Sequence, residues 1–268
     1  MTPPTRLGDL DVEAYLADPS KKQAFVTPMF DVIAPRYDAF TRLFSFGMDA
    51  SWKREALVAA VSAIDAARES RGELSGAVTV LDLASGTGDL AVGVARRVPG
   101  AQVTALDASL QMIVSARARL HTRDADVATR VQTTVGDMCA LPVPDASQDV
   151  VTAGYGVRNV SDRLRAIAEM ARVLRPGGTV VLLDFYRPEF ALWRGLVLWY
   201  LSLAGNAVGW WWHRDPIVYG YIARSIDHFV SWQRFSRELE TAGFRVVSVK
   251  RYLFGAVVRH EAIRLPRA

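Results

Sequence analysis

The chain has 268 residues, 50% of them hydrophobic and 22% charged, with a formal net charge of +4. This composition suits one globular α/β domain with extensions and excludes collagenous, repetitive and disordered chains. A single cysteine, Cys139, excludes an internal disulfide framework and favours a reducing, cytoplasmic compartment. The first ten residues lack the apolar core of a secretory signal, so we expect none there.

The N-terminal part of the chain predicts helices. Apolar residues recur at spacings of three and four from about residue 11 to 70. Pro28 and Pro35 are expected to interrupt this stretch, and Pro35 to break or restart a helix. Residues 71–76 then predict a turn-rich linker.

From residue 78 onward, short apolar runs alternate with amphipathic helices. Pro176-Gly177-Gly178 is expected to end the third of these helices. Such alternation predicts a parallel sheet covered on both faces, with ligands bound beyond the carboxyl ends of its strands. The expected strands are 78–84, 102–106, 131–135, 149–154 and 179–185, and the expected helices run to residue 97, from 109 to 121 and from 161 to 174.

Residues 195–212 contain no charged side chain and just reach the length of a transmembrane helix. Asn206, the glycines and the surrounding α/β pattern instead favour a helical cap over an apolar pocket. A helix at 231–242 and strands at 245–252 and 256–263 complete the pattern. We therefore expect an N-terminal helical extension (1–76) and a core (77–268) with an apolar cap insertion (189–228), forming one structural unit.

The basic excess lies at the C-terminal end. Residues 244–268 have a net charge of +5, which leaves −1 for the rest of the chain. This end could meet anionic lipid headgroups or nucleic acid. The simpler interpretation, which we favour, places these charges on the solvated faces of the last strands.

A glycine turn follows the first expected strand, in Ser85-Gly86-Thr87-Gly88-Asp89. Glycines suit a tight turn that brings backbone close to a ligand. Asp107 ends the second strand about 20 residues later, where a carboxylate accepts from ribose hydroxyls. Asp82 and Asp89 flank the turn and would repel a pyrophosphate, and no P-loop lysine follows. These features favour S-adenosylmethionine (SAM), which is cationic and carries no phosphate, although Asp89 could equally cap the helix.

A third motif, Gly136-Asp137-Met138, follows the third strand. Asp137 could accept from an adenine amino group while Met138 packs on the purine. Alone this would be an ordinary turn, but beside the other two motifs it favours the cofactor. The four histidines show no ligand spacing, so we expect no metal.

Several longer segments resemble the ubiquinone/menaquinone biosynthesis C-methyltransferases (UbiE/MenG-like), over about residues 25 to 263. The similarity implies a Rossmann-like class I SAM methyltransferase fold, with a mostly parallel seven-stranded sheet, N-terminal helices and a helical cap after strand five. The matching segments are Met29-Phe30-Asp31-Val32-Ile33-Ala34-Pro35-Arg36-Tyr37-Asp38, the glycine motif, Gly156-Val157-Arg158-Asn159-Val160, Arg172-Val173-Leu174-Arg175-Pro176-Gly177-Gly178, Tyr219-Gly220-Tyr221-Ile222-Ala223-Arg224-Ser225-Ile226 and Ala242-Gly243-Phe244.

The resemblance implies C-methylation of a prenylated quinol, with demethylmenaquinol favoured over a benzoquinol. It assigns Arg158 and Tyr37 to catalysis and Asn159 and Tyr155 to the quinol. The residues assigned to SAM are Gly86, Thr87, Gly88, Asp107, Asp137, Met138 and Gly154. The chain departs from the family pattern at three places. Ser85 replaces the usual Cys or Gly, and Gly154 stands where relatives often have a Ser that contacts the cofactor. The unusually aromatic Trp210-Trp211-Trp212 leaves the identity of the quinone undecided.

In the expected mechanism, deprotonation of a quinol hydroxyl pushes electron density onto the ortho carbon, which attacks the methyl group. Arg158 would pair with the developing phenolate, with a relayed water as base. An alternative role for Arg158 is a structural cap near Val160, and His260 is either a base or a structural histidine.

The expected partners are the quinol and, through peripheral contact, the inner face of the membrane. Whether the chain forms a homo-oligomer is left open, and nucleic acid is not expected as a partner. A methyltransferase of another apolar acceptor and a non-catalytic SAM- or quinone-binding accessory protein are the alternatives. Ala153-Gly154-Tyr155-Gly156 at the fourth strand disfavours an rRNA methyltransferase, which would carry an Asn-Pro-Pro-Tyr-type turn there.

Overall fold

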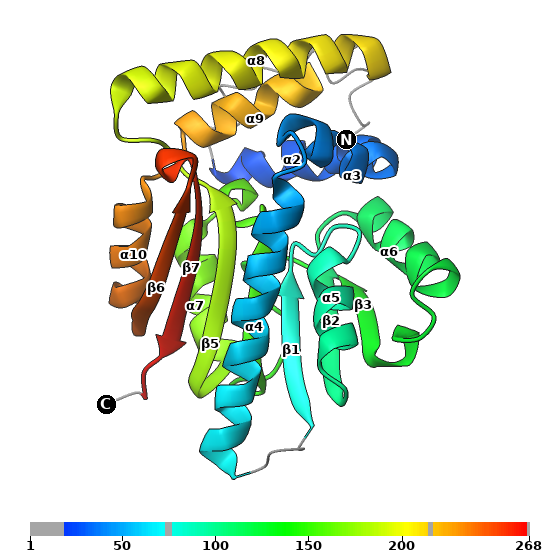
Figure 1. The fold of residues 1–268 in the computed structure, drawn as a ribbon, viewed down its shortest axis with the longest axis vertical. Helices are drawn as coiled ribbons and strands as arrows, with labels where there is room; N and C mark the ends of the chain where they lie inside the picture. Colours follow the sequence, from blue (N-terminus) through cyan, green and yellow to red (C-terminus); the bar gives the residue numbers. More distant parts are fainter. Residues whose placement is uncertain (1–18, 73–76, 214–216, 267–268) are drawn as a thin grey trace.

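The computed structural model describes residues 19–72, 77–213 and 217–266. Figure 1 shows one twisted sheet with helices against both faces and a group of helices beyond one end. The strand order in the described chain is β3-β2-β1-β4-β5-β7-β6, and β7 runs antiparallel to both of its neighbours. The strands are β1 (Val78–Leu83), β2 (Ala101–Asp107), β3 (Val131–Val135), β4 (Gln148–Gly154), β5 (Leu174–Phe185), β6 (Phe244–Tyr252) and β7 (Val257–Arg264). The mostly parallel seven-stranded sheet is as predicted.

Each face of the sheet has its own apolar core. Helices α4 (Asp49–Arg71) and α5 (Asp89–Arg97) pack on one face, and α7 (Arg163–Val173) and α10 (Trp232–Thr241) pack on the other. In β1, Val78 and Val80 belong to the first core and Leu81 and Leu83 to the second. Both sides of the strand are buried, which explains its almost continuous apolar run. Helix α4 shares a core with the sheet, so the predicted boundary at residue 76 separates two elements that pack against each other. The division into an N-terminal extension and a core stays a prediction.

The N-terminal segment forms α2 (Pro19–Ile33), η2 (Ala34–Arg36) and α3 (Tyr37–Phe44) before α4. Pro35 restarts the helix as predicted, but the interruption predicted at Pro28 is wrong, because Pro28 lies inside α2. Burial of Val26, Met29 and Ile33 holds this helix in place through the proline, so tertiary packing outweighs the local preference.

The predicted boundary between the third helix and the fifth strand is also wrong. Helix α7 ends at Val173, and β5 begins at Leu174 rather than at residue 179. Leu174 pairs with Gln148 across a register shift in β4. Gly177 has a φ of +81°, and a Cβ at Gly178 would lie 2.9 Å from the Arg175 carbonyl oxygen. The two glycines therefore let the strand pass through an irregularity instead of ending there.

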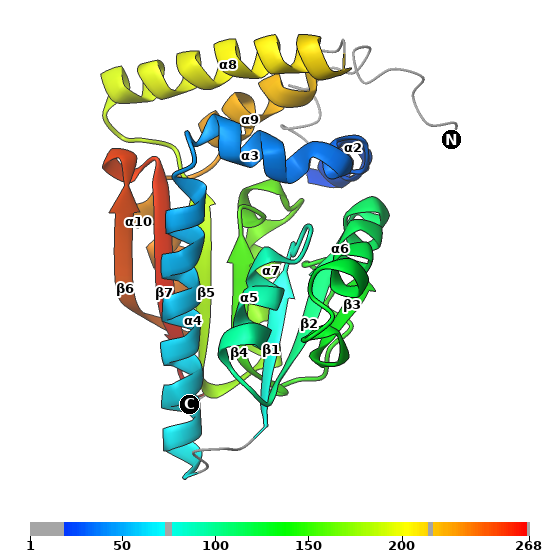
Figure 2. The same cartoon turned by 45° about the vertical axis from the view of Figure 1, so that its right-hand side comes forward.

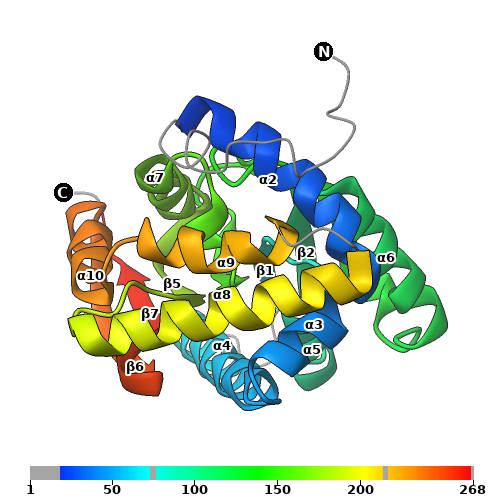
Figure 3. The ribbon, with the colours of Figure 1, turned by 90° about the horizontal axis from the view of Figure 1, so that it is seen from above.

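The predicted cap forms α8 (Ala191–His213) and α9 (Ile217–Asp227). Together with α2 and α3, these helices lie beyond the carboxyl ends of the central strands (Figure 2), and α8 and α9 run side by side (Figure 3). No helix in the part of the chain that the structure describes combines the length and apolar character that a bilayer crossing requires. The first ten residues and the side chains of Trp210, Trp211 and Trp212 lie outside the description.

The C-terminal charges do not form a single free patch. Arg264 is buried and donates to the Leu174 carbonyl, and Arg259 pairs with Glu261. Lys250 lies 2.5 Å from Glu55. Arg245 and Arg251 are exposed, so among the described basic residues of the last strands the favoured solvated-face interpretation holds in part.

His260 lies in the core on β7, where its Nδ1 is 3.2 Å from the Tyr186 hydroxyl and its Nε2 is 3.0 Å from Ser236 Oγ. Burial lowers the pKa of His260 from 6.5 to about 4. The histidine lines none of the cavities described below. The structural alternative therefore accounts for it better than a role as base.

The lowered pKa of His260 predicts a loss of stability in acid. The unfolded chain binds the proton between pH 6.5 and 4 and the folded chain does not, so the contribution of His260 is complete above pH 6.5 and is lost as the pH falls. At pH 5 this loss is about 2 kcal/mol relative to pH 7.5. In urea unfolding at both pH values, His260→Gln should show a smaller acid loss than the unsubstituted chain. Equal losses would contradict this.

Candidate functional site

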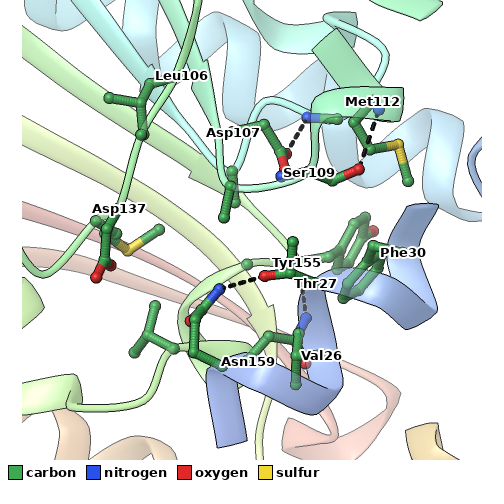
Figure 4. Close-up of a pocket in the computed structure, with 18 of the residues that line it drawn as sticks. Val26, Thr27, Phe30, Leu106, Asp107, Ser109, Met112, Asp137, Tyr155 and Asn159 are labelled. Carbon is green, nitrogen blue, oxygen red and sulfur yellow. Dashed lines mark hydrogen bonds between the residues drawn. The ribbon is translucent and has the colours of Figure 1, made fainter. Parts of the chain in front are cut away.

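A cavity of about 620 Å³ lies at the carboxyl ends of the central strands, and we call it the cofactor cavity. Its walls come from the turns after β1, β2, β3 and β4 and from α2, which contributes Val26, Thr27 and Phe30 (Figure 4). Its lining includes Val26, Phe30, Tyr37, Gly86, Leu106, Asp107, Ser109, Met112, Asp137, Met138, Gly154, Tyr155 and Asn159. The strand ends that the sequence predicted to carry the site therefore meet in one place.

Asp107 is tied to the glycine turn. Its Oδ2 accepts from the Gly86 backbone N–H at 2.8 Å, and its Oδ1 accepts from Ser109 N at 2.9 Å. Gly86 has a φ of +54°, a conformation that favours glycine. Burial raises the pKa of Asp107. Each carboxylate oxygen keeps a lone pair for a ligand hydroxyl, so Asp107 both shapes the loop and can accept from a bound nucleoside.

The third motif forms the opposite wall. Asp137 Oδ1 accepts from Cys139 N at 2.8 Å, and Met138 lies against the cavity beside Leu106. A Cβ at Gly136 would lie 2.8 Å from Leu106 Cδ1, and one at Gly156 would collide with Ala84. The chain therefore needs glycine at Gly156, whereas a side chain at Gly136 would force Leu106 to move.

Two residues assigned to SAM do not line this cavity. Thr87 Oγ1 donates to Asp38 Oδ1 at 2.8 Å and joins the glycine turn to α3. Gly88 has a φ of +87° and is the N-cap of α5. Thr87 lines a smaller neighbouring cavity with Lys53, and Gly88 lines neither that cavity nor the cofactor cavity.

The acids beside the turn do not form the negative wall that the sequence suggested. Asp89 pairs with Lys53 at 2.7 Å and with Arg119. Burial opposes ionisation of Asp89, but the two cations hold its pKa below the usual value, while burial raises the pKa of Asp82 to about 7. The prediction that Asp82 and Asp89 would repel a pyrophosphate and so favour SAM is therefore wrong. The cavity lining favours SAM in another way, because its described residues include Asp107 and Asp137 but no lysine or arginine.

A second cavity of about 650 Å³, which we call the reaction pocket, adjoins the first. Phe30, Tyr37 and Tyr155 line both. The remaining wall is mostly apolar and comes from the N-terminal helices, β5 and the cap; it includes Met29, Ile33, Phe44, Trp52, Phe185, Leu201, Tyr221 and Ile222. Its charged lining residues, among those the structure describes, are Asp49 and Arg158.

Arg158 lies on η4 (Val157–Asn159) and is held by Asp184. Its Nη1 is 2.6 Å from Asp184 Oδ1 and donates to the Tyr155 carbonyl at 2.8 Å, while its backbone N–H donates to Asp184 Oδ2 at 3.1 Å. Burial would lower the pKa of Arg158, but Asp184 and Tyr37 outweigh it and raise the pKa. The buried Arg158 Nε has no hydrogen-bond partner among the described residues. This N–H is therefore left for a ligand.

Asn159 and Tyr155 complete the loop. Asn159 Nδ2 donates to the Tyr155 carbonyl at 3.1 Å, and Asn159 Oδ1 accepts from the Tyr221 hydroxyl at 3.2 Å. Tyr155 has a φ of +61°, which is strained for a bulky residue. Its buried hydroxyl has no partner in the described part of the chain.

Sequence reasoning missed Asp49. Asp49 is 7% exposed, and its carboxylate accepts from Ser45 Oγ at 3.0 Å and lies 3.4 Å from Lys53 Nζ. The break at residues 45–48 between α3 and α4, where Gly47 has a φ of +78°, carries Asp49 into the pocket. A Phe-Gly pair followed by an acid before a helical pattern was the available signal.

Comparison with known proteins decides the family. The model of the ubiE/COQ5 methyltransferase family matches residues 18–264. The chain belongs to this family. It is 34% identical to the ubiquinone/menaquinone biosynthesis C-methyltransferase UbiE of Geotalea daltonii, over 84% of this chain and 90% of that protein. It is 31% identical to the demethylmenaquinone methyltransferase of Lactiplantibacillus plantarum, over 88% and 94%.

Solved structures agree on the fold. The [4+2]-cyclase SpnF matches with a TM-score of 0.61 and 18% identity, over 90% of this chain and 95% of that one. A putative methyltransferase in complex with the Haloferax volcanii Trm112 activator matches with a TM-score of 0.59 and 20% identity, over 88% and 98%. The protein is thus a SAM-dependent methyltransferase with the class I fold, as the sequence predicted.

Proposed function

We propose that this methyltransferase methylates a ring carbon of a prenylated quinol, with demethylmenaquinol as the favoured acceptor. The observation that carries the proposal is the reaction pocket, an apolar chamber that adjoins the cofactor cavity and has one carboxylate and one guanidinium, those of Asp49 and Arg158, in its described lining. A flat apolar ring with an ionisable hydroxyl matches such a pocket. The names of the relatives support the same acceptor class.

The cofactor cavity suits SAM in its chemistry. Asp107 would accept from the ribose hydroxyls, Asp137 from the adenine amino group, and Met138 would pack against the purine. Gly86 and Gly154 give the backbone room to approach, while Thr87 and Gly88 fix the turn from behind. SAM, when bound, supplies an electrophilic methyl group. The carboxylates favour its cationic groups, and no described lysine or arginine in the lining favours a pyrophosphate.

In the reaction pocket we assign Asp49 as the general base. Its carboxylate lines the pocket and would accept the proton of the quinol hydroxyl, with Lys53 Nζ 3.4 Å away. The Arg158 guanidinium, with its unpartnered Nε–H, would stabilise the resulting phenolate, and the free Tyr155 hydroxyl could donate to it as well. The phenolate activates its ortho carbon, which gains the methyl group and then loses its own proton.

Tyr37 and Asn159 would align the reactants. Tyr37 lines both cavities and closes their common wall from α3. Burial raises the pKa of Tyr37, which keeps it a neutral donor. Asn159 holds the Tyr155 carbonyl and the Tyr221 hydroxyl, so it fixes the loop and the cap side together. The apolar walls exclude water, which favours a transfer in which positive charge on sulfur disappears.

We also propose peripheral contact with the inner face of the membrane, where a prenylated quinol resides. The support is a set of exposed apolar side chains on the cap and the loops beside it, namely Phe46, Phe190, Leu192, Leu196, Trp199 and Phe254. Contiguous exposed apolar side chains mark surfaces that meet lipid or another apolar partner.

The Arg158–Asp184 pair predicts a separation of stability from activity. Arg158→Met leaves a buried carboxylate without its cation and should lower the free energy of unfolding by about 3–5 kcal/mol. Adding Asp184→Leu removes that charge, so the double variant should be more stable than the single one in urea unfolding, yet equally inactive. A double variant that regains quinol methylation would remove Arg158 from the mechanism.

Quinone analysis of a strain that lacks the gene tests the proposed acceptor. Accumulation of demethylmenaquinone, reversed by the unaltered gene, is the expected result. Accumulation of a demethylated benzoquinone would move the acceptor to ubiquinone biosynthesis. Unchanged quinones would contradict the proposal and favour another apolar acceptor.

A further inference from the structure

A further cavity, of about 850 Å³, lies between α8, the turn that joins α3 to α4, and the turn between β6 and β7. We call it the cap groove. Its walls include Phe46 from the first turn, Leu253 from the second, and Trp193, Leu196, Trp199 and Tyr200 from α8. Figure 3 shows α8 running across the top of α4 at this end of the molecule.

The cap groove continues the reaction pocket. Phe44, Trp52 and Phe185 line both. A molecule whose ring lies beside Asp49 therefore has an adjoining space in which a long substituent can continue.

The cap groove offers no polar partner to a ligand. Its described lining contains no charged side chain. Its polar groups are already paired within the protein: Trp193 Nε1 donates to the Leu253 carbonyl at 3.0 Å, Tyr200 donates to the Phe44 carbonyl at 3.3 Å, and Ser45 donates to Asp49. An occupant with hydrogen-bonding groups would leave them unsatisfied there, whereas a hydrocarbon chain would lose nothing.

The outer edge of the cap groove is apolar and exposed. Phe46 is 74% exposed, Trp199 64% and Leu196 51%. Phe46 stacks on Tyr200 at a ring-centroid distance of 5.5 Å, so one face of this exposed ring contacts α8. Water contact with these side chains costs free energy that an apolar occupant would recover.

We propose that the cap groove is the binding site for the isoprenoid tail of the acceptor, with the tail running from the reaction pocket past Trp52 to the exposed edge at Phe46 and Trp199. This inference rests on the proposed function. It explains why an enzyme that reacts only at a ring carries a large apolar cap. Each buried methylene contributes about fourfold in affinity, so even one or two isoprenoid units in the groove would dominate acceptor binding.

Steady-state methylation of two acceptors tests the inference: a demethylated naphthoquinol with a long isoprenoid tail, and the same ring without a tail, both in detergent. The readout is the ratio of kcat/KM for the tailed acceptor to kcat/KM for the tailless one. Leu196→Gln and Trp199→Gln should each lower this ratio at least tenfold, mainly through KM for the tailed quinol. The matched control is Leu164→Gln on α7, which should leave the ratio unchanged. Leu164 is an exposed helical leucine (57%) and lines neither the cofactor cavity, the reaction pocket nor the cap groove.

The outcomes separate the two proposals. If the unsubstituted enzyme methylates neither quinol, the proposed function fails. If it methylates both but the groove variants leave the ratio unchanged, the tail binds elsewhere and the inference is overturned. A change in oligomeric state by light scattering, without a change in the ratio, would instead make the groove a contact between copies of the chain and would also overturn it.

Discussion

Replacing Asp49 with asparagine should lower kcat for quinol methylation by about 10²- to 10⁴-fold, the usual contribution of a positioned general base. The amide fills the same space and can still accept from Ser45, but it cannot take a proton from the quinol hydroxyl. We propose that SAM binds in the adjoining cavity, whose lining does not include Asp49, so SAM affinity measured by calorimetry should stay within about threefold. The measurement is single-turnover methyl transfer at saturating SAM.

The matched control is Asp65→Asn, an exposed carboxylate on the same helix, α4. It should leave kcat and SAM affinity unchanged. Thermal unfolding of both variants shows whether the fold is kept. If Asp49→Asn folds normally and keeps a kcat close to that of the unsubstituted enzyme, the proton is taken by another group, and the water relay at Arg158 that the sequence suggested would become the better mechanism.

Replacing Asp107 with alanine should weaken SAM binding by about 10- to 100-fold, because hydrogen bonds to a charged group contribute roughly 1.5–3 kcal/mol. The change removes the proposed acceptor of the ribose hydroxyls. It also frees the Gly86 and Ser109 N–H groups that now shape the turn. Calorimetric titration with SAM measures the effect.

The control for Asp107 is Asp126→Ala, an exposed carboxylate outside the cavities that pairs with Arg96. It should leave SAM affinity as it is. An unchanged dissociation constant for the folded Asp107→Ala variant would mean that the cofactor cavity has been assigned to the wrong residues.

Much of the fold follows from local pattern. Strands buried on both faces produce apolar runs whatever their neighbours are, so β1 and β4 were predicted almost to the residue. Prediction failed where a distant contact overrules a local preference. Pro28 continues a helix because its neighbours are buried, and β5 starts early because Leu174 pairs with Gln148.

The site divides in the same way. Asp107 and Asp137 were predicted because each follows a strand, and parallel strands bring their ends together. The charge state of Asp89 could not be predicted, since Lys53 and Arg119 lie 36 and 30 residues away in the sequence. The proposed role of Asp49 depends on how α3 and α4 fold back over the sheet, so the Phe-Gly pair before it could mark a turn but could not place the carboxylate in the pocket.

The central claim is that a methyl group passes from SAM to a ring carbon of a prenylated quinol. The most direct measurement incubates the purified enzyme with reduced demethylmenaquinone and SAM carrying a deuterated methyl group, and locates the label by mass spectrometry and NMR. The label should appear on the ring carbon ortho to a hydroxyl, giving menaquinol. Label on oxygen, or no label under conditions where SAM binding is confirmed, would contradict the claim.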